Sequence, residues 1–305
     1  MYKAHLLTVA TLALFVVAPK AAAQCVTVDP VIIPQVRIDP LDASGAGALV
    51  QPFYLTFRRA AVHDDPIRIR YQIVDDDSAA IARIGLSQGP TVEWTSVGGS
   101  RDIGALRHES YSLLRTGIVV LDRGELAAQS QAAIRLSDLR VDLPAGVYRE
   151  QFSVRFWCEA EETGVAYEAN GAVAASAAVP NVLSANVAGA SSRGEIDFLN
   201  FETLARSLQV SVRSTGPFRV TARSENSGVM LRDGARADAA PSDRIPYQAS
   251  FDGEALSVRG GRDQIMPRAG LGGRQFPLDV RVSDVSANRA GAYADTLYLI
   301  LEPAN

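Results

Sequence analysis

Short stretches in which apolar and polar residues alternate recur along this chain, separated by Gly, Pro, Asn, Asp and Ser. Because successive side chains of a strand point to opposite faces of a sheet, a period of two predicts strands with one buried face. Residues 67–73 place Ile and Tyr on one face and Arg and Gln on the other, and residues 208–222 form an alternating run, a Ser-Thr-Gly-Pro turn and a second alternating run. Sustained helical periodicity is nearly absent, so the sequence predicts an all-β protein.

An internal repeat divides the chain in two. Ile134–Leu139 is echoed by Val280–Val285, with Arg, Ser and Asp at the same places. Each copy is soon followed by Ala-Gly-x-Tyr, at Ala145–Tyr148 and at Ala290–Tyr293, and then by a long alternating run. Two β-sandwich domains that end alike are therefore expected.

The N-terminal residues indicate export. Lys3 precedes the uncharged apolar run Leu6–Ala18, and the small residues Ala21–Ala23 follow, which is the pattern of a secretory signal peptide over residues 1–23. The apolar run is shorter than the roughly 20 residues that span a bilayer. Lipidation of Cys25 is an alternative, but Gln24 stands where that processing requires a small residue.

The remaining length suits two domains. We expect an N-terminal adhesin-like sandwich at 24–160, a linker at 161–180 and a C-terminal sandwich at 181–305. The linker is placed where acidic residues give way to the Ala-rich stretch Ala172–Ala178 and then Pro180. A short helix or the approach to a strand are other interpretations of those alanines.

The chain has two cysteines, Cys25 and Cys158. In an exported protein they are expected to pair, and a bridge closing a loop of roughly 130 residues would stabilise the first domain by a few kcal/mol. A metal site is the alternative, but neither cysteine has a second ligand at CxxC spacing.

No motif indicates catalysis or a cofactor. GxSxG and HExxH motifs are absent, and the only histidines beyond the signal peptide, His63 and His108, both lie in the first half. The glycine pairs lack the Lys and Ser or Thr of a phosphate loop. We therefore predict no catalytic residue and no cofactor.

Metal and nucleic-acid binding are not indicated either. The cluster Asp75–Asp77, with Asp64 and Asp65 upstream, could suggest calcium, but it lacks the spacing of an EF-hand and is typical of a solvated turn. The net charge is −4 with scattered Arg and Asp, so no basic face for nucleic acid is expected.

Several motifs of the second half occur together. They are Glu195–Phe198, Leu208–Val212, Phe218–Ala222, Ser224–Gly228, Ile245–Ala249 and Ala290–Leu297. With them, the region from about Val182 to Leu301 resembles the spore coat protein U-like family, which includes the subunits of archaic chaperone-usher pili. The first half shares only the ending.

The resemblance implies an immunoglobulin-like sandwich that lacks its seventh strand. In the family a periplasmic chaperone covers the gap, and the N-terminal extension of an adjacent pilin subunit then fills it. The edges flanking the gap would be Val182–Val187 and a pairing edge made of Asp295, Thr296, Leu297, Tyr298, Leu299, Ile300 and Leu301. The sequence stops at Asn305, which would leave nothing to pair with that last run.

A subunit that donates a strand needs a free extension before its own domain, and Cys25 would leave no room for one. The chain then resembles a pilus tip adhesin at the cell surface, with a periplasmic chaperone, an outer-membrane usher and an adjacent pilin as partners. Its first domain would contact a host or abiotic surface.

No ligand-binding residue can be named, since Trp94 suits either a surface anchor or a core. The alternatives are a secreted or periplasmic two-domain binding protein and an exported hydrolase using His63 or His108.

Overall fold

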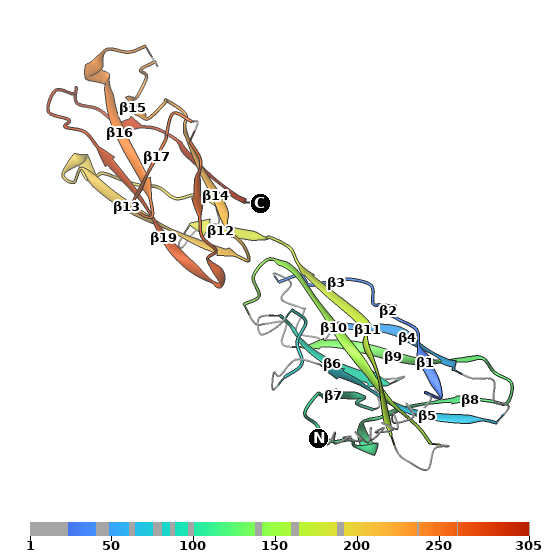
Figure 1. The fold of residues 1–305 in the computed structure, drawn as a ribbon. Coiled ribbons are helices and arrows are strands. Elements are labelled where there is room, and N and C mark those ends of the chain that lie inside the picture. The colour runs from blue at the N-terminus through green and yellow to red at the C-terminus, as the bar shows by residue number, and fades with distance from the viewer. Residues whose placement is uncertain are drawn as a thin grey trace, which may run out of the picture.

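The computed structural model describes residues 24–40, 49–60, 65–75, 81–85, 89–96, 101–137, 142–159, 165–187, 192–236, 238–260 and 262–304. The predicted signal peptide lies outside them. The chain is all-β and forms two β-sandwich domains that lie end to end (Figure 1). The helices in the described part are single 3-10 turns, η3 (Leu113–Arg115), η4 (Leu199–Phe201) and η5 (Pro241–Asp243). None of these described helices is long and apolar enough to cross a membrane.

The first domain packs two sheets face to face. One sheet has the order β1-β4-β9-β6, and the other has the order β2-β11-β10-β5-β7, with β3 on β11 and β8 on β5. The strands are β1 (Val26–Val28), β2 (Val31–Ile32), β3 (Val36–Arg37), β4 (Leu49–Arg59), β5 (Ile67–Asp75), β6 (Thr91–Ser96), β7 (Gly104–Leu106), β8 (Gly117–Leu121), β9 (Ala127–Ser137), β10 (Gly146–Cys158) and β11 (Ala166–Val179).

Large aromatic side chains fill the space between these two sheets. Trp94 is buried between Phe53 and Phe152, with ring centroids 5.8 and 4.8 Å away. Trp94 is thus a core residue, and the alternative of a surface anchor is wrong. Such edge-to-face ring pairs add to the stabilisation that comes from burying apolar area.

The second domain repeats this plan with fewer strands. One sheet has the order β12-β13-β19-β16-β15-β20, with β17 on β16, and the other has the order β18-β14-β21. The strands are β12 (Leu183–Val187), β13 (Ala205–Ser214), β14 (Phe218–Ser224), β15 (Val229–Arg232), β16 (Arg244–Phe251), β17 (Glu254–Leu256), β18 (Gln264–Met266), β19 (Gly270–Val282), β20 (Tyr293–Ala294) and β21 (Leu297–Pro303). Its separate core is built around Phe218, Phe251 and Phe276.

The repeated Ala-Gly-x-Tyr motif forms the same corner in both domains. The hydroxyl of Tyr148 donates to the carbonyl of Pro144 at 2.7 Å, and that of Tyr293 donates to the carbonyl of Arg289 at 2.7 Å. The glycines of the motif also match, with φ of 157° at Gly146 and 150° at Gly291. A tyrosine bonded to backbone just upstream marks the strand after a corner in immunoglobulin-like sandwiches, so the repeat identifies β10 and β21 as equivalent strands.

The predicted linker at 161–180 is corrected by the structure. Most of it is β11, which pairs with β10 from Gly146↔Val179 to Trp157↔Ala166 and contributes buried side chains to the first core. The Ala-rich stretch is strand because its backbone pairs with β10 along residues 146–152, and its alternate residues Val173, Ala175 and Ala177 are buried in the core. The first domain therefore extends to Val179.

The two domains are joined by three residues, Pro180, Asn181 and Val182, held by hydrogen bonds. The buried Thr215 accepts from the Val182 amide and donates to the Pro180 carbonyl. The Asn181 amide group donates to the Ala304 carbonyl at 2.7 Å. This junction therefore binds the start of the second domain to the end of β21.

A side-chain bridge also crosses between the domains. The Asp142 carboxylate accepts from Arg268 at 3.0 Å and from the Leu271 amide at 2.9 Å. The Ala145 amide donates to the Thr215 carbonyl at 2.8 Å. These contacts connect the corner of the first domain to β19 and the β13–β14 turn.

Cys25 and Cys158 form a disulfide, as the sequence predicts. It joins the residue before β1 to the last residue of β10. The same place in the second domain is joined without cysteines, by the hydrogen bond from Asn181 to Ala304.

Candidate strand-acceptor site of the second domain

Strand β21 has a neighbour on one edge. It pairs antiparallel with β14 from Ser224↔Leu297 to Phe218↔Pro303. Among the residues that the structure describes, none forms a ladder with the other edge of β21. Alternate backbone N–H and C=O groups of β21 are therefore available to an additional strand.

The equivalent strand of the first domain, β10, is paired on both edges. It lies between β5 and β11, with Val154 opposite Ile73 and Ala169. The other sheets of the two domains correspond strand for strand, as β1-β4-β9-β6 and β12-β13-β19-β16. What the second domain lacks in its described part is a counterpart of β11.

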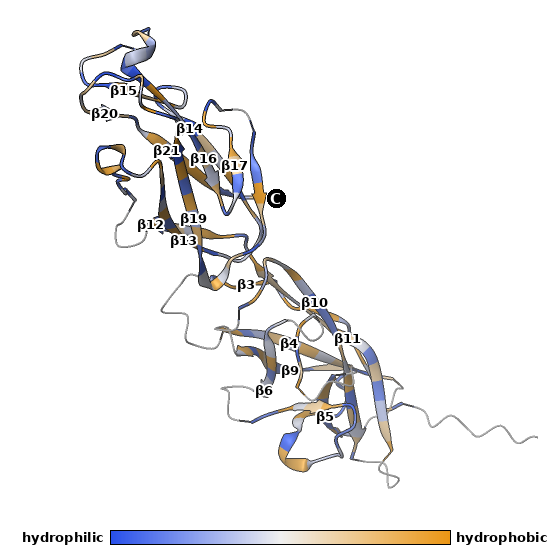
Figure 2. Cartoon of the chain, turned by 90° about the vertical axis from the view of Figure 1, so that its left-hand side faces the viewer, coloured by the Kyte–Doolittle hydropathy of each residue, from blue (hydrophilic) through white to orange (hydrophobic). Residues whose placement is uncertain are grey.

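The inward side chains of β21 show the consequence. Leu297, Leu299 and Leu301 face the core but are only partly buried. Their counterparts Phe152, Val154 and Phe156 on β10 are exposed by 1% or less. Figure 2 shows where β10 and β21 lie in the two domains, with the ribbon coloured by hydropathy. The unpaired edge of β21 therefore borders an apolar surface that is open to water.

The opposite side of this surface is formed by the start of the domain. Strand β12 pairs with β13 from Leu183↔Ser214 to Val187↔Val210, yet none of its side chains is fully buried. The residues 192–198 that follow form no ladder, although β2 and β3, which occupy the corresponding stretch of the first domain, both pair with β11. We call the surface between β21 and the described residues 183–187 and 192–198 the open edge. The motif Glu195–Phe198, expected as an opening strand, is not a strand here.

Two of the residues predicted to belong to the pairing edge lie outside the strand. Strand β21 begins at Leu297, so Asp295 and Thr296 precede it, while the strand continues past Leu301 to Pro303. The five residues from Leu297 to Leu301 lie on β21 as expected. Their use by a partner remains a prediction.

Asp295 fixes the start of β21 through its carboxylate. It accepts hydrogen bonds from the Ser224 hydroxyl at 2.5 Å, from the Tyr247 hydroxyl at 2.7 Å, and from the backbone and side-chain amides of Asn226 at 3.1 and 2.9 Å. Burial raises the pKa of Tyr247, and the neighbouring Asp295 carboxylate adds to the increase, so this hydroxyl stays protonated at neutral pH. The cluster anchors one end of the open edge.

No family model and no curated protein matches the chain. Among solved structures, the chain is similar to a chain of the CsuC–CsuE chaperone–tip adhesion subunit complex of archaic chaperone-usher Csu pili from Acinetobacter baumannii. The identity is 12%, the TM-score is 0.42, and the match covers 91% of this chain and 99% of that chain.

Two further similarities are to adhesins. The CupB6 tip adhesin of Pseudomonas aeruginosa is 13% identical over 90% of this chain and 92% of that chain, with a TM-score of 0.44. CfaE, the adhesive subunit of CFA/I fimbria of enterotoxigenic Escherichia coli, is 11% identical over 91% of this chain and 94% of that chain, with a TM-score of 0.46. Because these identities and TM-scores are low, a function for this chain has to be inferred from its own strand pairing.

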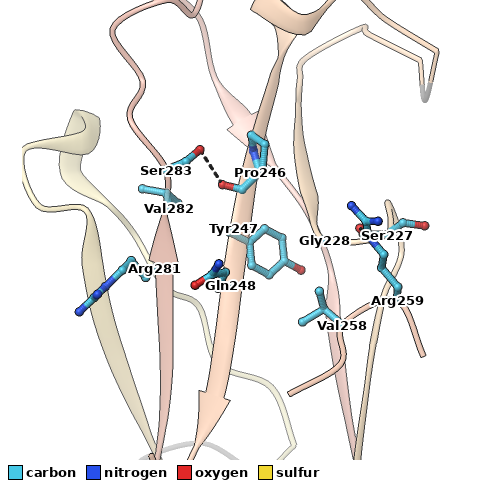
Figure 3. A pocket seen from close by; sticks show the side chains of 10 residues that line it. All are labelled: Ser227, Gly228, Pro246, Tyr247, Gln248, Val258, Arg259, Arg281, Val282 and Ser283. Carbon is cyan, nitrogen blue, oxygen red and sulfur yellow. Dashed lines mark hydrogen bonds between the residues drawn. The ribbon is translucent and has the colours of Figure 1, made fainter. Parts of the chain in front are cut away.

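A hollow of about 360 Å³ lies elsewhere in the second domain (Figure 3). It is lined by Ser227, Gly228, Pro246, Tyr247, Gln248, Val258, Arg259, Arg281, Val282 and Ser283. The lining contains no carboxylate and no histidine, and the Tyr247 hydroxyl is bonded to Asp295. These lining groups do not assemble an acid–base pair or an activated nucleophile.

Of the residues weighed for hydrolysis or calcium binding, the structure describes His108, Asp65 and Asp75. His108 is exposed, and His63 lies outside the described residues. Asp75 is buried while Asp65 is exposed, and Asp64, Asp76 and Asp77 lie outside the described residues.

The structure also shows an exposed apolar group in the first domain that the sequence pattern did not single out. Leu113 and Leu114 of η3 are 56% and 84% exposed, and Tyr111 packs on Trp157 with ring centroids 4.3 Å apart. The signal in the sequence is a pair of leucines that does not fit an alternating strand. We call these four residues the apolar group of the first domain.

Proposed function

We propose that this chain is a non-catalytic subunit of a chaperone-usher pilus, and that its second domain accepts a strand from another polypeptide at the open edge. The observation that carries the proposal is the contrast between β21 and β10. Equivalent strands have equivalent inward residues, but Leu297, Leu299 and Leu301 remain partly exposed where the β10 residues are covered. A strand whose backbone groups are unpaired on one edge and whose apolar face is partly exposed to solvent favours addition of a further strand.

The partners follow from this chemistry. A periplasmic chaperone would cover the open edge first, and an adjacent pilin subunit delivered at an outer-membrane usher would replace it. A complete first domain, closed by β11 and by the disulfide, leaves that domain free for another task. We propose that it contacts a host or abiotic surface at the pilus tip, with the exposed apolar group, Tyr111, Leu113, Leu114 and Trp157, as the first place to search.

Addition of a strand in cis tests the acceptor role. After Asn305 we would append a flexible linker and a strand of alternating Val and Thr, long enough to run antiparallel along the whole of β21. Burying the exposed parts of Leu297, Leu299 and Leu301 should stabilise the second domain by about 3 kcal/mol. The measurement is the unfolding transition of the second domain in urea.

The matched control carries the same residues in an order that destroys the alternation. We expect the alternating strand to raise the stability of the second domain and the scrambled strand to leave it unchanged. Equal stability of all three chains would instead favour the alternative, a secreted two-domain binding protein whose second sandwich needs no partner.

A further inference from the structure

The floor of the hollow in the second domain lies on the outer face of β16 and β19. Tyr247 and Val282 are buried in the core, so their neighbours Gln248 and Arg281, which stand opposite each other, point outward. Residues 227–228 and 258–259, which follow β14 and β17, form a wall beside β16. The volume of about 360 Å³ is within the range of sites that hold a small molecule.

The wall is held in place by hydrogen bonds and by close packing. The Gly228 amide donates to the Ser224 hydroxyl at 2.6 Å, and the Gly228 carbonyl accepts from the Tyr247 amide at 3.0 Å. A Cβ on Gly228 would stand 2.6 Å from a methyl group of Val258, so only glycine fits there. Ser227 has a φ of 57°, which is unusual for a residue other than glycine. The hollow therefore has a fixed shape before any ligand binds.

The lining carries positive charge on two sides. Arg281 and Arg259 lie on opposite sides of β16 (Figure 3). The Nε of Arg259 donates to the Ser227 carbonyl at 3.3 Å, and neither guanidinium group makes an ion pair within the described part of the chain. Asp279 lies two residues before Arg281 on the same face of β19 but does not line the hollow. A concave surface with charge of one sign attracts ligands of the opposite sign.

The separation of the two arginines restricts the kind of anion. Because they lie on opposite sides of β16, a single phosphate or sulfate ion would contact one guanidinium group at a time. A chain molecule with several anionic groups can contact both. Between the two arginines, the exposed side chains of Ser227 and Gln248 have no hydrogen-bond partner among the described residues. The ligand therefore needs neutral polar groups between its charges.

An acidic saccharide matches these groups better than an acidic peptide. Carboxylate and sulfate groups accept paired hydrogen bonds from guanidinium groups. Sugar hydroxyls can either donate or accept, as the side chains of Ser227 and Gln248 also can. A peptide brings one backbone N–H donor with nearly every residue, and a lining whose charged groups are both arginines offers few acceptors for these donors.

We propose that this hollow binds an acidic saccharide. Its carboxylate or sulfate groups pair with Arg259 and Arg281, and its hydroxyl groups bond to Ser227 and Gln248. The inference goes beyond the proposed function and does not depend on it, because the site uses β16 and β19 rather than the unpaired edge of β21. The second domain then has a binding task of its own.

Calorimetric titration of the full chain, with its disulfide intact, tests for binding. The probes are a hexasaccharide of uronic acids, a sulfated hexasaccharide, neutral maltohexaose and a hexaglutamate peptide. At least one acidic saccharide should bind, more weakly as the salt concentration rises, and the tighter of the two identifies the anionic group. Absence of saccharide binding, equal binding of maltohexaose, or equal binding of hexaglutamate would each overturn the inference.

Paired substitutions test the place of binding. Arg259→Gln with Arg281→Gln removes two charged donors and should weaken saccharide binding by at least about tenfold. The matched control, Arg213→Gln with Arg223→Gln, removes the same charge from exposed residues of this domain that do not line the hollow. The control should bind almost like the unmodified chain. An equal loss in both chains would show attraction by net charge alone and would overturn the site.

A third variant tests the hollow without changing its charge. Gln248→Ala removes one neutral hydrogen-bonding group and should weaken binding by about threefold or more. On saccharide addition, the largest NMR shift changes should occur at residues 227–228, 248, 259 and 281. Unchanged affinity of Gln248→Ala, or shift changes concentrated in the first domain, would contradict binding in the hollow. The strand appended after Asn305 should leave saccharide affinity unchanged, so the acceptor role and the saccharide site can fail separately.

Discussion

The corner tyrosines Tyr148, on β10, and Tyr293, on the short β20 just before β21, precede inward apolar residues at the same intervals, but in the described part of the chain only β10 has a neighbour on each edge. The first domain obtains its additional strand from the chain itself, whereas the described part of the second domain provides none. The difference shows that an alternating sequence determines which face of a strand is apolar. Whether that apolar face is shielded from water depends on whether another strand pairs with the free edge.

The largest expected difference between the domains comes from the disulfide. Replacing both cysteines, by Cys25→Ser with Cys158→Ser, opens a loop spanning 133 residues and should destabilise the first domain by about 4 to 5 kcal/mol. The second domain contains no cysteine and should keep its transition. Denaturation followed separately for each domain would measure both effects, and an equal loss in the second domain would show that the two domains unfold as one unit.

Truncation of equivalent inward residues should have unequal effects. Phe156→Ala removes a fully buried ring and should cost about 3 to 5 kcal/mol, whereas Leu301→Ala at the open edge should cost about 1 kcal/mol. Urea unfolding of the two variants provides the comparison. In the chain completed by the alternating strand, the cost of Leu301→Ala should increase by at least about twofold, because the side chain is then buried. An unchanged cost would mean that the appended strand does not cover it.

The anchor at the start of β21 should matter to the second domain alone. Asp295→Ala leaves the Tyr247 hydroxyl, the Ser224 hydroxyl and the Asn226 amides without their acceptor and should cost about 3 kcal/mol. Asp238→Ala is the matched control, because this aspartate of the same domain is exposed. Calorimetry should show a lower second transition for the first variant only, and equal behaviour of the two would show that the carboxylate does not anchor β21.

The smallest expected effect is shared by the two domains. Tyr148→Phe and Tyr293→Phe each delete one hydrogen bond to backbone and should each cost about 1 kcal/mol in their own domain. Thermal unfolding would check this. A loss in only one domain would mean that the corners are not equivalent, and the register between β10 and β21 would lose its basis.

The sequence predicted the elements that depend on local pattern and missed those that depend on neighbours. The alternating runs and the repeat were sufficient for two all-β domains, and the cysteine pair was predicted from the compartment. The Ala-rich stretch 172–178 was expected to be a linker, because alanine has a low strand propensity. It is a strand because its backbone pairs with β10 on one edge and with β2 and β3 on the other, and those partners are not encoded in the local composition.

The open edge shows the same limit at shorter range. The alternation around Tyr298 predicted the pairing strand, but the strand starts two residues later than expected because the Asp295 carboxylate bonds inward to the β14–β15 turn and to Tyr247. The adhesive surface proposed for the first domain could not be predicted from the sequence, because Leu113 and Leu114 interrupt the strand pattern without forming a recognisable motif.

Amide hydrogen exchange of the unmodified chain tests most directly whether β21 has an unfilled edge. A strand paired on one edge protects alternate amides, and a strand paired on both edges protects nearly all of them. We expect protection to alternate from Leu297 to Glu302 in β21 and to be continuous from Phe152 to Cys158 in β10. Continuous protection of β21 in the isolated chain would contradict the acceptor role, because the edge would then already be filled.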